Sequence, residues 1–145
     1  PPKGGDRDQI KAAAAGQCDI AVANTYYLAG MLTSRDGAQR AAASKVAVFW
    51  PNQGGRGTHV NISGAALTKA ARNKSAAIKL AAFLASAESQ VWYAEINGEY
   101  PVLANAPVSK LLASWGTFKA DALNLGRLGE LNTEAVMLMD RAGWK

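Results

Sequence analysis

Short apolar runs and helical stripes of apolar residues alternate along this chain, and the alternation predicts an α/β protein. A short run rich in Val, Ile and Ala, or a strict alternation of polar and apolar positions, is typical of a β-strand. Three segments show one of these patterns and are predicted to be strands: residues 18–23, 46–50 and 58–62. Three strands among many helices predict an α/β fold in which helices cover the faces of a sheet.

Helical periodicity and capping residues predict helices elsewhere. Asp6 is a suitable N-cap and Gly16 a suitable C′ residue for the first helix. Asn73 can cap a later helix in which Ile78 and Leu84 belong to an apolar stripe. The predicted helices are residues 7–15, 26–34, 38–44, 74–85, 89–96, 109–115 and 128–139.

The composition narrows the class of protein. At 145 residues, with 49% hydrophobic and 19% charged residues, the chain is predicted to be globular and long enough for one ordinary domain. The net charge is +5, but the basic residues are scattered and do not interleave with aromatic residues, so we expect no nucleic-acid partner. The single cysteine, Cys18, excludes an intrachain disulfide. The opening Pro-Pro-Lys-Gly-Gly-Asp is typical of a loop inside a longer protein, so we expect a fragment.

The end of the first predicted strand carries the most chemical information. Asn24, Thr25, Tyr26 and Tyr27 follow it directly. Successive side chains on a strand point to opposite faces, so the two tyrosines can share one target only if the strand has ended and a helix begins near Tyr26. Phenolate oxygens suit a hard, highly charged cation, whereas Asn24 and the free N–H groups of a helix start suit a small anion. The junction therefore suggests a ferric iron site, although tyrosine pairs also occur simply as packing residues.

Five segments spread along the chain recur together in one known family, in the same order and spacing. They are residues 18–27, 48–52, 56–64, 97–102 and 138–144. Together they resemble the bacterial periplasmic ferric iron-binding proteins, the solute receptors of iron(III) ABC transporters. The resemblance implies that Tyr26 and Tyr27 coordinate Fe(III) and that Asn24 helps to hold a synergistic anion, carbonate or phosphate.

The resemblance also implies an architecture and a set of partners. We expect a periplasmic-binding-protein-like (type II) two-lobe fold of which this chain is the carboxyl-terminal half. Residues 1–57 and 102–145 are assigned to the carboxyl-terminal lobe, and residues 58–101 to a segment that returns through the hinge to the amino-terminal lobe. The remaining iron ligands are expected in the missing amino-terminal half. The implied partner is an ABC transporter permease in the inner membrane, and the implied location is the periplasm.

Two other classes of function remain open from the residues alone. A receptor of the same fold could bind another anionic or organic solute, with the tyrosines as hydrogen-bond donors. An α/β enzyme fragment could use a tyrosine as a general acid. His59, the only histidine, does not match the metal histidine of the family and is predicted to be structural, and no plausible catalytic triad is present. We therefore expect a binding protein and not an enzyme.

Overall fold

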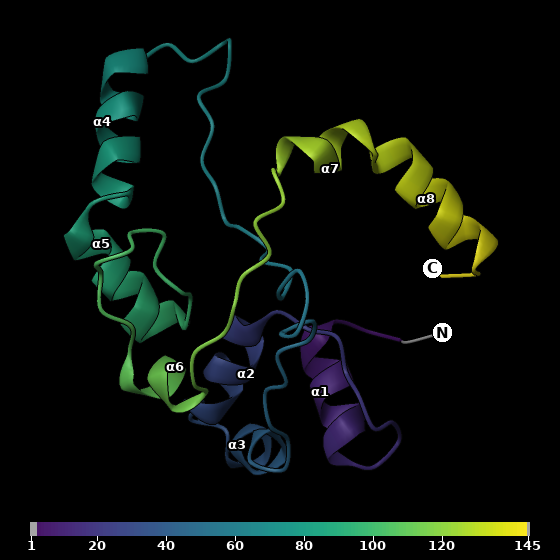
Figure 1. Cartoon of the computed structure of the whole chain (residues 1–145). Helices are drawn as coiled ribbons and strands as arrows, with labels where there is room; N and C mark the ends of the chain where they lie inside the picture. The colour runs from purple at the N-terminus through teal and green to yellow at the C-terminus, as the bar shows by residue number, and fades with distance from the viewer. Residues whose placement is uncertain (1–2, 145) are drawn as a thin grey trace.

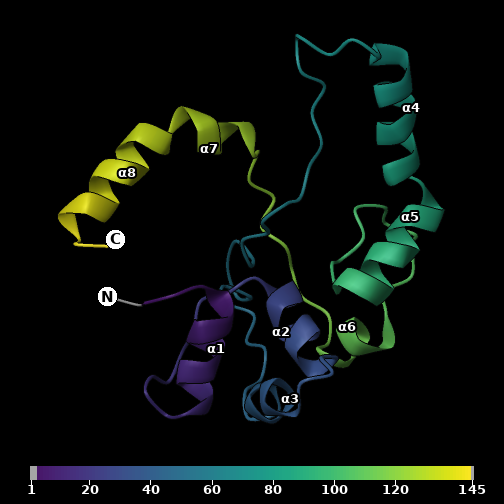
Figure 2. The same ribbon diagram turned by 180° about the vertical axis from the view of Figure 1, so that it is seen from behind.

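The computed structural model describes residues 3–144, and most of its regular structure is helical (Figures 1 and 2). Its elements are α1 (Asp6–Ala14), α2 (Thr25–Leu32), α3 (Gly37–Ala43), α4 (Lys74–Leu84), α5 (Ala87–Trp92), the π-helical η1 (Tyr93–Asn97), α6 (Lys110–Ser114), α7 (Gly126–Glu130) and α8 (Asn132–Arg141). Every predicted helix is present. The predicted helix 89–96 is divided between α5 and η1, and the predicted helix 128–139 between α7 and α8.

The ends of α1 show how local chemistry sets a helix boundary. Gly16, with φ +71°, is the left-handed residue that follows the helix, as predicted. The prediction of Asp6 as the N-cap is wrong, because Gly5 takes that position and donates its N–H to Oδ2 of Asp8 at 3.1 Å. The carboxylate of Asp6 is thereby left for a distant partner, the backbone N–H of Asn24.

The three predicted strands do not form a sheet among residues 3–144, so this structure does not confirm the α/β prediction. The only pairing within the described chain is an isolated parallel bridge between Thr58 and Ala120. A strand is stabilised by hydrogen bonds to a neighbouring strand, and the first two predicted segments have no such neighbour here. Their apolar side chains consequently remain exposed: Ile20 by 79%, Val22 by 85% and Phe49 by 81%.

The main core lies where α1, α2 and α3 meet, in the lower part of Figure 1. Its buried side chains are Ile10 of α1, Leu28 and Met31 of α2, and Ala43 of α3. Trp115 packs against this cluster from a distant part of the chain. Burying a Leu, Ile or Met side chain contributes about 1.5–3 kcal/mol, so the core holds α2 firmly in place.

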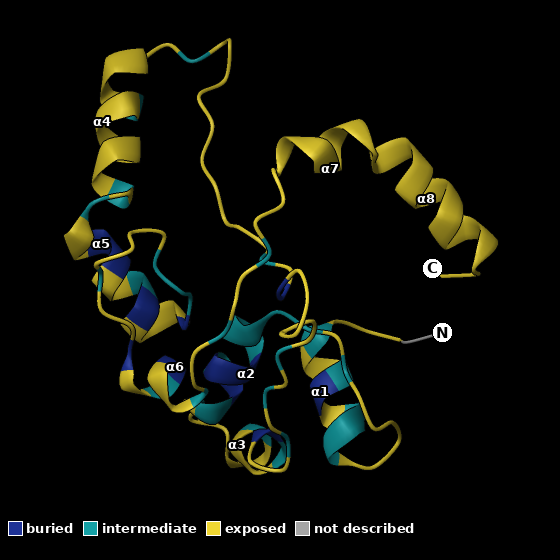
Figure 3. Cartoon of the chain, viewed as in Figure 1, coloured by how far each residue is buried: buried dark blue, intermediate teal, exposed yellow. Residues whose placement is uncertain are grey.

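The helices α4, α7 and α8 lie outside this core. None of the three contains a buried residue, and Figure 3 shows their ribbons exposed over nearly their whole length. Their exposed large apolar side chains are Ile78, Leu80, Phe83, Leu128, Val136, Met137, Leu138 and Met139. Contiguous apolar faces of this kind are typical of packing surfaces. No helix within residues 3–144 has the length and apolarity that crossing a membrane requires.

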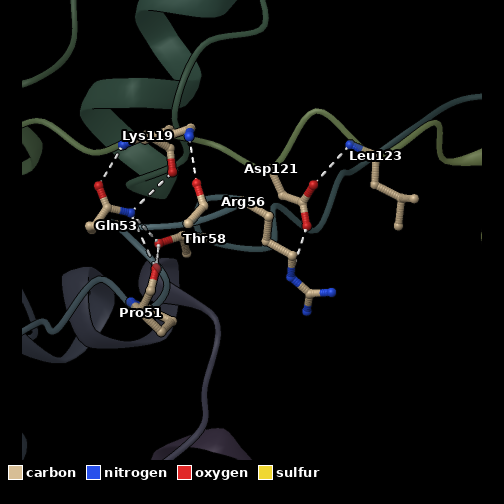
Figure 4. Close-up of polar contacts among 8 residues, drawn as sticks. Pro51, Gln53, Arg56, Thr58, Lys119, Asp121 and Leu123 are labelled. Carbon is tan, nitrogen blue, oxygen red and sulfur yellow. Dashed lines mark hydrogen bonds and ion pairs between the residues drawn. The ribbon is translucent and has the colours of Figure 1, made fainter.

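Two segments far apart in the sequence, residues 51–58 and 119–123, lie side by side where they meet, at the central crossing (Figure 4). The N–H of Thr58 donates to the carbonyl of Lys119 at 2.8 Å, and the N–H of Asp121 donates to the carbonyl of Thr58 at 2.8 Å. The Gln53 carboxamide links the same two segments, since Oε1 accepts from the N–H of Lys119 at 2.7 Å and Nε2 donates to Oγ1 of Thr58 at 2.9 Å. These bonds fix the position from which the chain leaves Thr58.

Candidate metal and anion site

Helix α2 begins at the junction where the sequence places the candidate site. Asn24 is its N-cap, with φ −71° and ψ 137°, so Tyr26 and Tyr27 lie in the first turn. Their ring centroids are 4.5 Å apart and the planes are tilted by 38°. The two phenols therefore lie together at the start of the helix, where the N–H of Tyr27 donates to the carbonyl of Asn24 at 3.1 Å and the N–H groups of Thr25 and Tyr26 have no carbonyl partner in the described structure.

The electrostatic surroundings keep Tyr26 protonated. A side-chain hydrogen bond with Tyr27 raises the pKa of Tyr26 above its ordinary value of 10.0. Desolvation and the negative charges of the nearby carboxylates of Asp6 and Glu99 act in the same direction. At neutral pH Tyr26 is therefore a neutral phenol, and a cation that binds its oxygen has to displace the proton.

Helix α1 supplies two contacts that the sequence analysis did not assign to the site. Oδ1 of Asp6 accepts a hydrogen bond from the N–H of Asn24 at 2.8 Å, which fixes the backbone at the start of α2. The guanidinium carbon of Arg7 lies 5.3 Å from the centre of the Tyr27 ring, a cation–π distance. A carboxylate in the first turn of a helix, such as that of Asp6, suggests a cap and not a long-range contact. No sequence pattern marks Arg7 as a neighbour of Tyr27, so neither contact could be predicted from the sequence.

The chain that follows the central crossing also reaches the site. Nδ2 of Asn61 donates to Oδ1 of Asn24 at 3.1 Å, and the hydroxyl of Ser63 donates to Oε1 of Glu99 at 3.1 Å. Glu99 is one of the charges that raise the pKa of Tyr26. The segment containing Asn61 and Ser63 therefore borders the start of α2, and sequence reasoning did not identify it.

The hard donors at the start of α2 are chiefly the two phenols. Within residues 3–144, no three side chains of the His, Cys, Asp and Glu types come together as a metal site. His59 is exposed and its side chain makes no hydrogen bond in the described structure. Two phenol oxygens fill only part of a six-coordinate shell, so a ferric ion here needs an anion, water or ligands from another part of the protein.

Gly98, the residue that follows η1, lies close against α2. It has φ +66°, and a Cβ at this position would lie 2.3 Å from Cβ of Ala29 and 3.9 Å from Cα of Tyr26. We expect Gly98→Ala to destabilise the protein by about 1–3 kcal/mol through overpacking, in addition to the left-handed strain, because an alanine methyl group cannot rotate away. Denaturant unfolding measures the loss, and the displacement of α2 should also weaken ligand binding.

Gly116→Ala is the matched control for this prediction. Gly116 also has a positive φ, +78°, but no atom lies within 4 Å of the position of its Cβ. It therefore reports backbone strain without a clash. Equal destabilisation by the two substitutions would show that the close approach of Gly98 to Ala29 does not contribute to the loss of stability.

Comparison with known proteins supports the resemblance found in the sequence. The family of bacterial extracellular solute-binding proteins matches residues 5–120. Iron uptake protein A1 from Synechocystis sp. is 48% identical over 144 residues, which cover 99% of this chain and 40% of that protein.

Two solved structures are similar to this chain over almost its whole length. The Trichodesmium protein IdiA (FutA), in complex with iron and citrate ligands, has a TM-score of 0.94 and 51% identity, covering 100% of this chain and 46% of that one. The ferric binding protein from Campylobacter jejuni has a TM-score of 0.94 and 38% identity, covering 99% and 46%.

These matches cover almost the whole of this chain but less than half of each relative. The chain spans about 40% of the length of its curated relative and about 46% of the two solved structures. The relatives are iron uptake and ferric binding proteins, as the resemblance implied. Since the family match extends over most of its residues, the chain belongs to the bacterial extracellular solute-binding protein family.

Proposed function

We propose that the intact protein, meaning the longer receptor of which this chain forms part, binds ferric iron together with a synergistic anion. The observation that carries the proposal is the pair of phenols of Tyr26 and Tyr27, with ring centroids 4.5 Å apart at the start of α2. Phenolate is a hard anionic donor that suits Fe(III), and the helix start suits an anion. The iron-bound Trichodesmium structure, 51% identical to this chain, supports the assignment.

Each candidate residue has a distinct role in this proposal. Tyr26 and Tyr27 supply phenolate oxygens to the metal. Asn24 and the first N–H groups of α2 hold the anion, because the positive end of the helix dipole and free donors meet there. The citrate in the Trichodesmium structure supports an oxygen-rich anion in general, and carbonate or phosphate remains our expectation for this protein.

We infer that the receptor has the two-lobe type II fold, with residues 58–101 returning to the amino-terminal lobe. The exposed apolar side chains of α4, which lies within residues 58–101, support this assignment, since the missing amino-terminal half is a natural cover for them. In this assignment the approach of Gly98 to α2 and the hydrogen bond between Asn61 and Asn24 are contacts between the lobes. The remaining iron ligands come from the missing half.

The receptor is proposed to act in the periplasm and to deliver iron to an ABC transporter permease in the inner membrane. Membership of an extracellular solute-binding family supports this location and this kind of partner. The enzyme alternative has no support among the relatives, which are iron uptake and ferric binding proteins. Measuring iron binding by the intact protein distinguishes a ferric receptor from a receptor for another anionic solute.

Proton release tests the role of the phenols in the intact protein. The pKa of Tyr26 is raised, so below that pKa its proton has to leave when iron binds, and the iron affinity should fall as the pH falls. Calorimetry in buffers of different ionisation enthalpy should count about one proton fewer per ferric ion in Tyr26→Phe than in the wild type. Proton release that is identical in the wild type and Tyr26→Phe would contradict phenolate coordination by Tyr26.

A further inference from the structure

We propose that Asn61 is a positioning residue for the anion: it holds the Asn24 carboxamide so that its N–H₂ group faces the anion. The inference rests on the proposed function and adds to it a residue outside α2. Asn61 acts through Asn24 and does not itself touch the metal in this proposal. The argument depends on the free groups of Asn24, on the way the chain reaches Asn61 and on the chemistry of a carboxamide.

The Asn24 side chain does not form the capping hydrogen bond that is usual at the start of a helix. Asparagine at an N-cap ordinarily accepts a hydrogen bond from a backbone N–H in the first turn, but Asn24 makes no such bond. Its Oδ1 instead accepts from Nδ2 of Asn61 at 3.1 Å, and its backbone N–H donates to Asp6 at 2.8 Å. Nδ2 of Asn24 has no acceptor among the described residues, so it is the one group of this residue left for a ligand.

The orientation of a carboxamide decides whether it attracts or repels an anion. Its two ends have nearly the same shape, but Nδ2 donates hydrogen bonds and Oδ1 carries partial negative charge. A half-turn about the last side-chain bond of Asn24 would exchange them and turn the oxygen toward the anion. With Asn61 donating to Oδ1, as it does in this structure, Nδ2 of Asn24 stays available to the ligand, and a turn of Asn24 would keep the hydrogen bond only if Asn61 turned as well.

The central crossing gives Asn61 a fixed place from which to act. Thr58 is fixed to the facing segment through both of its backbone polar groups. Its N–H donates to the carbonyl of Lys119 and its carbonyl accepts from the N–H of Asp121, each at 2.8 Å. Asn61 follows three residues later, within about 10 Å along an extended chain. Ser63, two residues further, donates to Glu99 at 3.1 Å and not to Asn24. Of these two residues, Asn61 is therefore the one whose side chain contacts the proposed anion site through Asn24.

The test measures iron binding by the full-length receptor as a function of anion concentration, with bicarbonate and phosphate tried in turn. Asn61→Ala should raise the anion concentration needed for half-maximal iron retention about fivefold, the worth of one net hydrogen bond. Asn61→Asp should raise it by more than about tenfold, because a carboxylate takes up Nδ2 of Asn24 and adds negative charge beside the anion. At saturating anion, the iron affinity of Asn61→Ala should return to about the wild-type value.

A double substitution shows whether Asn61 acts through Asn24. If it does, Asn24→Ala combined with Asn61→Ala should have the same anion dependence as Asn24→Ala alone. Ser44→Ala is the control, since it removes an exposed hydrogen bond to the carbonyl of Ala41 and involves neither Asn24 nor the charges around Tyr26, and its anion dependence should be that of the wild type. Thermal unfolding of each variant separates loss of folding from loss of anion binding.

Three results would overturn the inference. Wild-type anion dependence in Asn61→Asp would show that Asn61 does not orient Asn24. Additive effects in the double variant, or an iron affinity lowered equally at every anion concentration, would assign Asn61 to packing between segments. A wild-type protein that binds no iron under any of these conditions would refute the proposed function itself, and this outcome is distinct from the other three.

Discussion

Tyr26→Phe and Tyr27→Phe are each expected to lower the ferric iron affinity of the intact protein by more than about 100-fold. Removing a residue that merely supports a metal ligand already costs about 10–100-fold in metal affinity, so removing a ligand should cost more. The two rings lie 4.5 Å apart, and phenylalanine preserves their packing while it removes the oxygen. Competition with a chelator of known ferric affinity measures the loss.

Tyr93→Phe is the control for this pair of substitutions. Tyr93 begins η1, and its ring packs edge-on against Trp92 with ring centroids 5.5 Å apart and not against the tyrosine pair. It should keep the wild-type affinity and colour. If both Tyr26→Phe and Tyr27→Phe also keep them, the ferric assignment is wrong and the tyrosine pair serves packing.

Gly57→Ala is expected to give the largest loss of stability. Gly57 has φ +100°, and a Cβ there would lie 2.7 Å from the carbonyl oxygens of both Lys119 and Ala120. Backbone atoms cannot rotate aside as a side chain can, so the two crossing segments must separate and the bonds of Thr58 must lengthen. Strain and overpacking together should lower the free energy of unfolding by about 3 kcal/mol, measured with urea.

Gly54→Ala provides the comparison for the crossing. Gly54 belongs to the same loop, but no atom lies within 4 Å of its Cβ position. This substitution should change the free energy of unfolding by less than about 0.5 kcal/mol. A Gly57→Ala protein as stable as Gly54→Ala would show that the two segments are not held together in solution as they are in this structure.

The helices could be predicted from the sequence because the interactions that define them are local. Gly16 ends α1 within one turn, and Asn73 precedes α4 as predicted. The strands could not be predicted in the same way, because a strand depends on a neighbour that can be distant in sequence. Thr58 alone finds such a neighbour within residues 3–144, and Ala120 lies far along the chain.

The candidate site shows the same division between local and distant information. Tyr26 and Tyr27 are adjacent, so the start of a helix beside them was enough to predict that their rings lie together. Asp6 and Asn61 reach Asn24 across separations of 18 and 37 residues. No short motif marks either of them, and only the folded chain brings their side chains to the start of α2.

The central claim, that the tyrosine pair binds ferric iron, is tested most directly by the colour of the intact protein. Phenolate bound to Fe(III) gives a visible charge-transfer absorption, and a ferric ion lowers the pKa of a bound phenol well below its reference value of about 10. Titration with a ferric chelate and an anion should produce this band, saturating at one iron per protein. The combined Tyr26→Phe and Tyr27→Phe variant should show no band. A wild-type protein without the band, or a double variant that retains it, would contradict the claim.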